Sequence, residues 1–244
     1  MSLFIIGTGP GDPELLAPRA AAALAAATDL VGYGPYLDRL PMVPGQARHA
    51  SDNRVELERA RHALGLAEAG RRVAVISAGD AGVFGMAAAV FEAIDAHPPW
   101  RGLDIEVIPG ISALLAASAR LGAPLGHDFC AISLSDNLKP WDTVLARLRA
   151  AATAGFVITL YNPISRARPW QLGAAFDLLR SLLPATTPVA FATAISRADE
   201  HVAIATIATA DPAAADMRTL VLVGTAATRH IDGTSWLYTP RRAA

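Results

Sequence analysis

The chain has 244 residues, of which 52% are hydrophobic and 18% charged, and its formal net charge is -1. This length allows one large α/β domain or two small ones, and the composition is too apolar for a disordered chain. The small net charge provides no overall field that would attract nucleic acid, so we expect no nucleic-acid partner.

Strands and helices alternate in the first half of the chain. Short apolar runs predict buried strands, and Ala- and Leu-rich stretches predict the helices between them. We expect Asp12 to cap the first helix, with Pro13 in its first turn, and either Ser51 or Asp52 to cap the second. The predicted strands are 3–7, 29–32, 72–76 and 104–108, and the predicted helices are 14–27, about 51–69, 86–94 and about 113–121.

The second half repeats this alternation after a stretch rich in Gly and Pro, which predicts a linker at about 122–126. We therefore expect two α/β domains, 1–121 and 127–244, each with its own sheet. The predicted strands are 129–133, 156–160, 188–193, 201–206 (a hairpin partner of the strand before it) and 220–224, and the predicted helices are about 141–152 and 169–183.

A glycine-rich turn follows the strand at 72–76. The run Ser77–Met86 carries three glycines and Asp80 at the carboxyl end of a predicted parallel strand, where open α/β sheets bind their ligands. Glycine lets a ligand approach the backbone closely, and the Asp80 carboxylate can accept a hydrogen bond from a hydroxyl or an amine. The alternative is a turn with a purely structural role.

Two other loops could likewise have either a ligand-binding role or a purely structural one. The glycine spacing in Gly7–Gly11 does not fit a dinucleotide-binding fingerprint, because Pro10 and Pro13 interrupt it. The aromatic loop Gly32–Tyr36 either covers a sheet edge or forms one wall of a cleft for a flat ligand.

Several kinds of site are not supported by the sequence. The six histidines are scattered, with no pair at the spacing of a zinc-binding helix, so we expect no metal site. The chain has no Gly-x-Ser-x-Gly elbow and no Gly-Lys-Ser/Thr phosphate loop, and Cys130 lies within a predicted strand. The turns at the strand ends are instead rich in Gly, Asn, Ser and Asp. Such turns favour a site that binds and positions a ligand, with the difficult chemistry supplied by a cofactor.

The single cysteine, Cys130, excludes an internal disulfide framework and favours a reducing compartment. Apolar runs stay well below the ~18 residues of a membrane span, and the run Leu3–Gly7 is too short for the core of a signal peptide. We therefore expect a cytoplasmic protein with no membrane partner.

Several motifs together resemble the tetrapyrrole methyltransferases of cobalamin and siroheme synthesis, and within them the branch that contracts the macrocycle. Much of the wider family has Pro where this chain has Ala81, and the ring-contracting branch is similar to this chain there. The resemblance covers nearly the whole chain. It rests on Gly9–Leu16, Val31–Tyr33, Ser51–Arg54, Gly79–Val83, Pro109–Ala113, Ser133–Trp141, Leu160–Pro163 and Thr193–Arg197.

The resemblance implies two α/β domains, each a mixed sheet flanked by helices, with S-adenosylmethionine bound in a cleft between them, and a homodimer. It implies a first glycine-rich loop that faces the tetrapyrrole. The implied cofactor positions are Pro10, Gly79, Asp80, Ala81, Ser112, Ala113, Tyr161, Asn162 and Ala190, with Val83 and Val223 as additions. The implied or inferred substrate positions are Gly9, Gly11, Asp12, Tyr33, Arg54, Lys139 and Arg166.

The activity that the resemblance implies is methylation of the tetrapyrrole at C17, coupled to ring contraction. Contraction requires removal of a hydroxyl proton, for which a loop carboxylate or a histidine is suited. Asp136, Asp52 and His127 are the candidates, with Asp136 ranked first. Their alternative roles are a turn residue, a helix cap and a linker residue bonded to Asp128, respectively.

Two functions of other classes stay open at this point: a module that binds a tetrapyrrole or a nucleotide without turnover, and a dehydrogenase, which the glycine-rich loops would also allow. The sequence also leaves open whether the substrate is free of cobalt or carries it.

Overall fold

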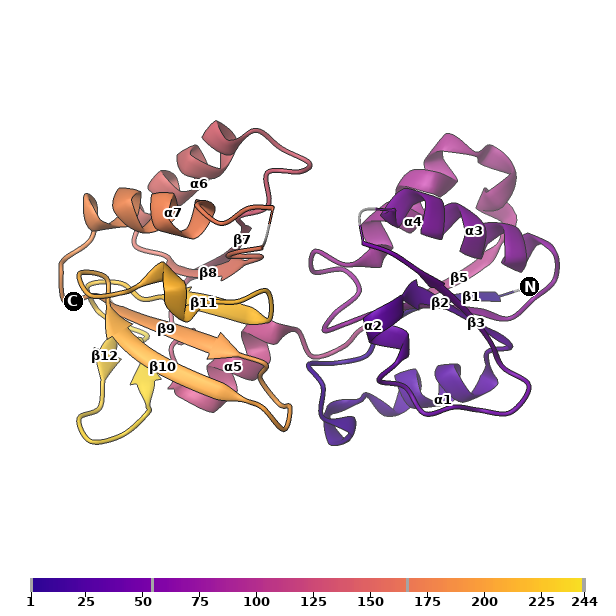
Figure 1. Cartoon of the computed structure of the whole chain (residues 1–244), viewed down its shortest axis with the longest axis horizontal. Coiled ribbons are helices and arrows are strands. Elements are labelled where there is room, and N and C mark those ends of the chain that lie inside the picture. Colours follow the sequence, from indigo (N-terminus) through magenta and orange to yellow (C-terminus); the bar gives the residue numbers. More distant parts are fainter. Residues whose placement is uncertain (1, 54, 166, 243–244) are drawn as a thin grey trace. The chain divides into compact units, whose positions relative to one another are not determined.

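The computed structural model describes residues 2–53, 55–165 and 167–242, and it divides into two compact units, Met1–Ala113 and Leu114–Ala244 (Figure 1). The division lies before the predicted linker at 122–126, because helix α5 (Ala113–Leu121) packs within the second unit. Leu121, for example, is buried against Val157, Leu222 and Leu237.

The first unit is built on a five-stranded sheet with the order β3-β2-β4-β1-β5. Every adjacent pair of strands is parallel, so this sheet is parallel throughout. The expectation of a mixed sheet in this unit was therefore wrong. The edge strand β3 was not predicted, because the sequence Ala-Arg-His-Ala-Ser lacks an apolar run. The strands are β1 (Ser2–Gly7), β2 (Asp29–Tyr33), β3 (Ala47–Ser51), β4 (Val73–Ser77) and β5 (Asp104–Ile108).

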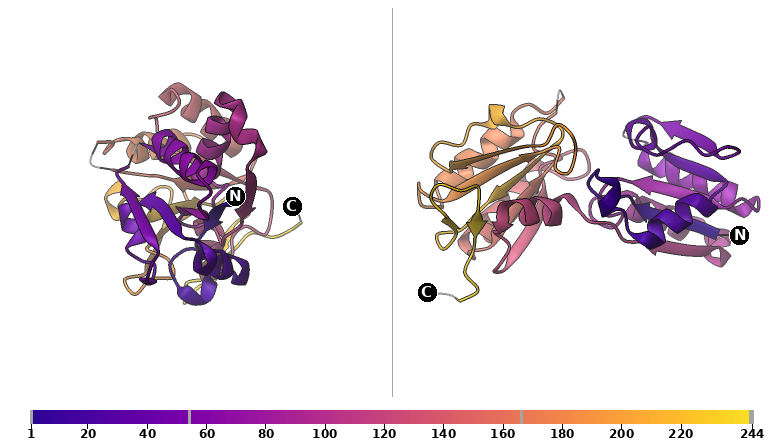
Figure 2. Two further views of the ribbon diagram at one scale, coloured as in Figure 1. Left: turned by 90° about the vertical axis from the view of Figure 1, so that its right-hand side faces the viewer. Right: turned by 90° about the horizontal axis from the view of Figure 1, so that it is seen from below.

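Helices cover both faces of this sheet (Figures 1 and 2). Helices α3 (Glu56–Glu68) and α4 (Met86–Ala96) pack on one face, where Leu3 and Ile5 are buried. Helix α1 (Pro18–Ala26) and the single turn α2 (Gly34–Leu37) pack on the other, where Ile6 and Ile76 are buried. The strands are therefore buried on two sides, as their apolar runs predicted.

Two predicted helix starts were wrong. Asp12 does accept a hydrogen bond from the Glu14 N–H, but it caps only a short 3-10 turn, Pro13–Leu15, and α1 begins at Pro18, whose missing N–H interrupts the helix. Helix α3 begins at Glu56, after Val55, with neither Ser51 nor Asp52 as its cap. The Ser51 hydroxyl instead accepts a hydrogen bond from Arg59.

The second unit holds a mixed five-stranded sheet with the order β10-β9-β11-β8-β7. Strands β7 and β8 are parallel, whereas β11 is antiparallel to both β8 and β9, and β10 forms the predicted hairpin with β9. Helices α6 (Trp141–Thr153) and α7 (Gln171–Arg180) pack on one face around Phe176. The strands are β7 (Phe129–Ser133), β8 (Val157–Tyr161), β9 (Pro188–Thr193), β10 (His201–Thr206) and β11 (Thr219–Val223).

A small third sheet, with the order β12-β13-β6, completes the second unit. Strand β6 (Gly122–Ala123) pairs in parallel with β13 (Leu237–Tyr238), which pairs with β12 (Arg229–His230). The segment predicted as a linker is therefore part of this unit. The α/β class and the two-unit organisation are as expected. Within the ranges that the structure describes, we found no helix with the length and apolarity to span a membrane.

Candidate active site

In the first unit, the candidate site residues lie at the carboxyl edge of the parallel sheet. The loops that follow β1 and β4 are joined there by two backbone hydrogen bonds, from Gly9 N–H to the Gly79 carbonyl at 3.0 Å and from Gly79 N–H to the Gly9 carbonyl at 2.8 Å. Gly79 has a φ of +67°, a conformation that glycine adopts without strain. The sequence therefore places glycine where the loops after β1 and β4 are hydrogen-bonded to each other.

Asp80 connects this pair of loops to the loop after β5. Its carboxylate accepts hydrogen bonds from the N–H groups of Gly82 at 2.8 Å and of Gly110 at 3.0 Å. The backbones meet so closely that a Cβ atom on Gly7 would lie 2.7 Å from both Gly110 N and the Gly79 carbonyl oxygen. The Asp80 carboxylate thus ties the loop after β4 to the loop after β5, while the Gly9–Gly79 pair ties the loop after β4 to the loop after β1.

The other predicted residues of the first unit lie in or beside these loops. Ala81 is fully buried in the core beneath α4, so only its backbone can face a ligand, and Ser112 is also buried. Gly9 and Pro10 are buried, whereas Gly11 is exposed and Asp12, Val83 and Ala113 are half-buried. Tyr33 lies at the end of β2 in an edge-to-face pair with Tyr36, with ring centroids 5.2 Å apart.

Asp52 follows β3 and is exposed at the same edge. The buried Arg59 side chain fixes this segment, donating to the Ser51 hydroxyl at 2.7 Å and to the Asp52 carbonyl at 2.5 Å. Burial lowers the pKa of Arg59. Arg54, a predicted substrate residue, lies outside the described residues.

In the second unit, the carboxyl ends of β7 and β8 form a hydrogen-bonded group around Ser133. The Ser133 hydroxyl accepts from the Asn162 amide at 3.0 Å, and the Ser133 carbonyl accepts from Lys139 Nζ at 2.8 Å. Burial lowers the pKa of Lys139, and the positive charge of Arg147 lowers it further. The Tyr161 hydroxyl accepts from the Leu114 N–H at 3.1 Å, at the start of α5.

Asp136 follows β7 in the same loop as Lys139. Its carboxylate accepts a hydrogen bond from Gln171 Nε2 at 3.2 Å, and Gln171 is only 1% exposed. The Gln171 Oε1 atom is buried without a hydrogen-bond partner. Trp141 and Trp170 form an edge-to-face pair beside this loop, with centroids 5.0 Å apart. Gln171 was not singled out from the sequence, because a helical glutamine carries no motif.

Three predicted residues of the second unit do not reach this edge. His127 precedes β7, so it lies at the opposite end of that strand from Asp136, and its Nδ1 accepts from the Asp128 N–H. Ala190 and Val223 are fully buried within β9 and β11, and Val223 pairs with Val189 and Ile158, away from the carboxyl ends of β8 and β9. Arg166 lies outside the residues that the structure describes.

Residues with strained backbone angles follow strands of both large sheets. Outside glycine, positive φ angles in the described chain occur at Phe84, Asn162, Ala194 and Ser196, and each follows a strand of one of the two large sheets. Such angles cost free energy and concentrate at functional sites. The Ser196 N–H donates to Glu200 at 2.8 Å, which holds the loop after β9 in place. Ala194 and Ser196 lie in Thr193–Arg197, one of the segments that carry the family resemblance, but the sequence did not predict their positive φ angles.

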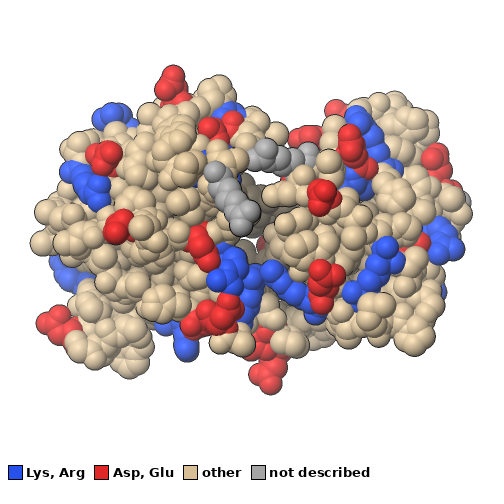
Figure 3. Space-filling model, viewed as in Figure 1, with Lys and Arg blue, Asp and Glu red and all other residues tan. Residues whose placement is uncertain are grey.

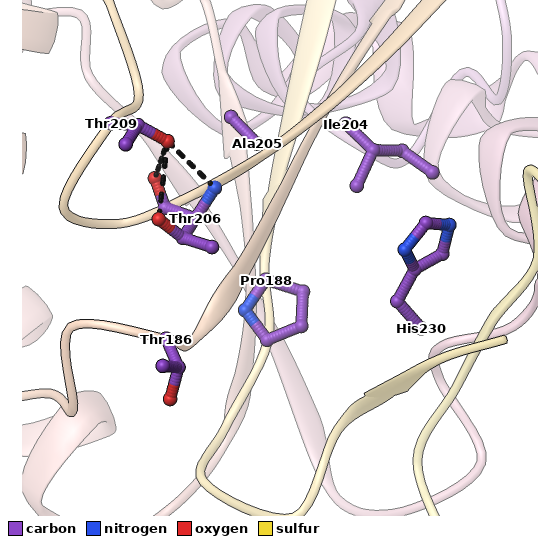
Figure 4. Close-up of a pocket in the computed structure, with 7 residues that line it drawn as sticks. All are labelled: Thr186, Pro188, Ile204, Ala205, Thr206, Thr209 and His230. Carbon is purple, nitrogen blue, oxygen red and sulfur yellow. Dashed lines mark hydrogen bonds between the residues drawn. The ribbon is translucent and has the colours of Figure 1, made fainter. Parts of the chain in front are cut away.

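Features elsewhere on the surface are less suited to a large ligand. A pocket of about 270 Å³ lies over edge strand β10 and is lined by Pro188, Ile204 and His230, among others (Figure 4). His230 Nε2 donates a hydrogen bond to the Thr234 carbonyl at 2.7 Å. On the face shown in Figure 3, acidic and basic side chains are interspersed, so binding of an anionic ligand requires local contacts.

The comparisons with known proteins agree on one family. A model of the tetrapyrrole (corrin/porphyrin) methylases matches residues 2–211. A precorrin-3B C(17)-methyltransferase from Sinorhizobium sp. is 57% identical over 98% of this chain and 96% of its own length. A probable cobalt-factor III C(17)-methyltransferase from Salmonella typhimurium is 43% identical over 98% of each chain.

Solved structures have the same fold. The crystal structure of the methyltransferase CobJ superposes with a TM-score of 0.95 at 50% identity, over 98% of this chain and 99% of that one. The uroporphyrin-III C-methyl transferase of Thermus thermophilus, complexed with S-adenyl homocysteine, has a TM-score of 0.69 at 23% identity, over 92% of each chain. The latter shows the fold alone.

Proposed function

Because this chain belongs to the tetrapyrrole (corrin/porphyrin) methylase family, we propose that it methylates precorrin-3B at C17 and contracts the macrocycle to give precorrin-4. The enzyme is a methyltransferase of cobalamin biosynthesis. The observation that carries the choice of substrate is the 57% identity, over almost the full length of both chains, to the Sinorhizobium precorrin-3B enzyme. The lower identity to the Salmonella cobalt-factor III enzyme makes the cobalt-bearing substrate the second candidate.

We propose S-adenosylmethionine as the methyl donor, which fits the product-like ligand named for the Thermus relative. When bound, it supplies an electrophilic methyl group on a sulfonium. The residues proposed to hold it are the loop 79–83 and Ser112 in the first unit, and Tyr161 and Asn162 in the second. The loops around Asp80 suit this task, since hydrogen bonds within the protein already order them.

Methyl transfer to carbon depends chiefly on alignment of donor and acceptor, and positioning alone can lower a barrier by about 7 kcal/mol or more. The protein needs no side-chain nucleophile for this step. The ties among Gly9, Gly79, Asp80 and Gly110 keep the loops from shifting, which is what such alignment requires.

For ring contraction we propose Asp136 as the base that takes the substrate's hydroxyl proton, and Lys139 as the cation that holds the departing carboxylate. Both belong to one loop after β7, and the hydrogen bond from Gln171 fixes the orientation of the Asp136 carboxylate. Lys139 is half-buried, which strengthens its attraction for an anion.

The test of this function is a pair of parallel assays with precorrin-3B and cobalt-factor III, each with S-adenosylmethionine, analysed by mass spectrometry and by ultraviolet–visible absorption. We expect precorrin-3B to gain one methyl group and to lose the spectrum of the uncontracted macrocycle. Turnover of cobalt-factor III alone would select the second candidate. Binding of either tetrapyrrole without any turnover would reject the enzymatic assignment.

Two further properties belong to the same proposal. We propose that the enzyme is a homodimer, as the resemblance implies, which sedimentation velocity can test. The single cysteine, Cys130, favours a reducing compartment, so we propose that the enzyme acts in the cytoplasm.

A further inference from the structure

Two histidines that are 13 positions apart in the sequence meet on the first unit. His49 lies in the middle of β3 and His62 in α3. His49 Nδ1 and His62 Nε2 are 3.1 Å apart, and the two rings are tilted by 57°. The sequence gave no sign of this pair, because its members come from a strand and a helix.

The buried Asp29 carboxylate sets the chemistry of the pair. Its Oδ1 lies 3.0 Å from His49 Nε2, and its other oxygen accepts from Arg71 Nε at 2.8 Å. Burial alone would raise the pKa of Asp29, but hydrogen bonds from Arg71, Thr28 and His49 outweigh burial and hold that pKa well below its usual range. An ionised carboxylate only accepts, so neutral His49 carries its proton on Nε2 and presents the Nδ1 lone pair to His62.

The geometry suits a shared ion as well as a hydrogen bond. Two nitrogens that each lie about 2.0–2.1 Å from a zinc ion in a tetrahedral site are roughly 3.3 Å apart. The two nitrogens are 3.1 Å apart and the two ring centroids are 4.8 Å apart. If both rings pointed straight along the line that joins the nitrogens, the centroids would be farther apart than this. At least one ring is therefore inclined to that line. A ring that is inclined in this way can direct its lone pair to a point beside the line joining the nitrogens.

We propose that His49 Nδ1 and His62 Nε2 form a binding site for a divalent transition-metal ion of the Zn²⁺, Ni²⁺ or Cu²⁺ type. Imidazole nitrogens favour these ions over Mg²⁺ and Ca²⁺. Asp29 orients His49 from behind, as carboxylates commonly do for metal-binding histidines. No group of three or more candidate ligand side chains was found in the described part of the chain, so water completes the coordination.

Such an ion would join two elements that flank the Asp52 segment. Strand β3 is the edge of the sheet and pairs only with β2, and α3 begins five residues after β3 ends. An ion held by both elements would resist separation of this edge strand from the helix. We therefore expect metal binding to stabilise the first unit against unfolding.

The experiment is a titration of the tag-free, EDTA-treated full chain with ZnCl₂ and NiCl₂ by isothermal calorimetry, with MgCl₂ as the ion control. We expect one Zn²⁺ or Ni²⁺ per chain and a rise in melting temperature of about 2 °C or more at saturating metal. His62→Ala should weaken binding at least ~10-fold, because only one imidazole remains. His97→Ala, which removes another exposed histidine, should bind as the wild type does.

Two variants secure the interpretation. His62→Gln replaces His62→Ala if the alanine variant does not fold, as judged by circular dichroism. Cys130→Ser should keep full affinity, since the free thiol at Cys130 lies in the other unit. Absence of binding by the wild type, equal affinity in the folded His62 variant, or loss of binding in Cys130→Ser with retention in the His62 variant would each overturn the proposal.

Discussion

Gly9 and Gly79 exchange a pair of backbone hydrogen bonds, which makes the loops after β1 and β4 one structural piece. Gly79→Val should abolish S-adenosylmethionine binding, because a β-branched side chain strains the backbone at φ +67° and adds bulk to the proposed cofactor loop. Calorimetric titration with the cofactor measures the loss.

Gly70→Val is the matched control for this variant. Gly70 has a φ of +86° and open space around it, so valine there costs a similar ~1–2 kcal/mol of stability without touching the site. Normal cofactor affinity in Gly79→Val, or equal losses in the two variants, would contradict the assignment. Ala81→Asp is unsuitable as a test, because it would place a carboxylate in the core.

Asp136→Asn should leave cofactor binding and methylation intact and cause uncontracted, methylated product to accumulate. Asparagine is almost isosteric but cannot take the hydroxyl proton. Mass spectrometry and absorption of the product separate the two steps. Asp232→Asn, an exposed change in the turn before β13, should behave as the wild type. Contraction at the normal rate in Asp136→Asn would reduce Asp136 to a turn residue.

Arg54→Ala should raise the apparent KM for the tetrapyrrole about tenfold and leave cofactor affinity nearly unchanged. Arginine pairs strongly with carboxylates, and each tenfold change corresponds to ~1.4 kcal/mol. Ser51 and Asp52, which precede Arg54 in the sequence, are anchored by Arg59. Arg61→Ala, on the exposed side of α3, is the control. Equal losses for both ligands would refute the separation of substrate and cofactor residues.

Asp29→Asn should lower the free energy of unfolding by about 2 kcal/mol at pH 7, since it removes charge-assisted hydrogen bonds from a buried site. The folded-state pKa of Asp29 is depressed, so its contribution is present above the unfolded-state pKa of ~3.9 and is lost as the pH falls below that value. Urea denaturation at pH 7 and pH 3 should therefore show a smaller deficit at pH 3. A deficit that does not depend on pH would contradict this account.

The strands with apolar runs were predictable, and so were the loops that follow them. Val73–Ser77 and its glycine turn lie where the sequence placed them, because a doubly buried strand must be apolar and a tight strand-to-helix turn needs glycine. Edge strand β3 could not be predicted, since a strand buried less deeply tolerates His and Arg.

Tertiary contacts decided what the local pattern could not. Ser51 has the chemistry of a helix cap, but the buried Arg59 claims its hydroxyl. The resemblance implied Ala190 and Val223 as cofactor positions, yet their side chains fill the core. Gln171 donates a hydrogen bond to Asp136 across 35 positions of sequence. Such pairings depend on how distant elements pack, which a one-dimensional pattern does not encode.

The pairing of β6 with β13 has a consequence for how the protein is made. The Thr239 hydroxyl donates a hydrogen bond to the Pro124 carbonyl, 115 positions earlier in the chain. During synthesis, Thr239 follows Pro124 by on the order of ten seconds, so this hydrogen bond cannot form before then. All strand pairs of the first unit, by contrast, lie between Ser2 and Ile108. On the ribosome, the first sheet can therefore form while Leu121 and its neighbours still lack Leu237, a partner in their core. During that interval the apolar surface of the unfinished second unit is the part of the nascent chain most in need of a chaperone.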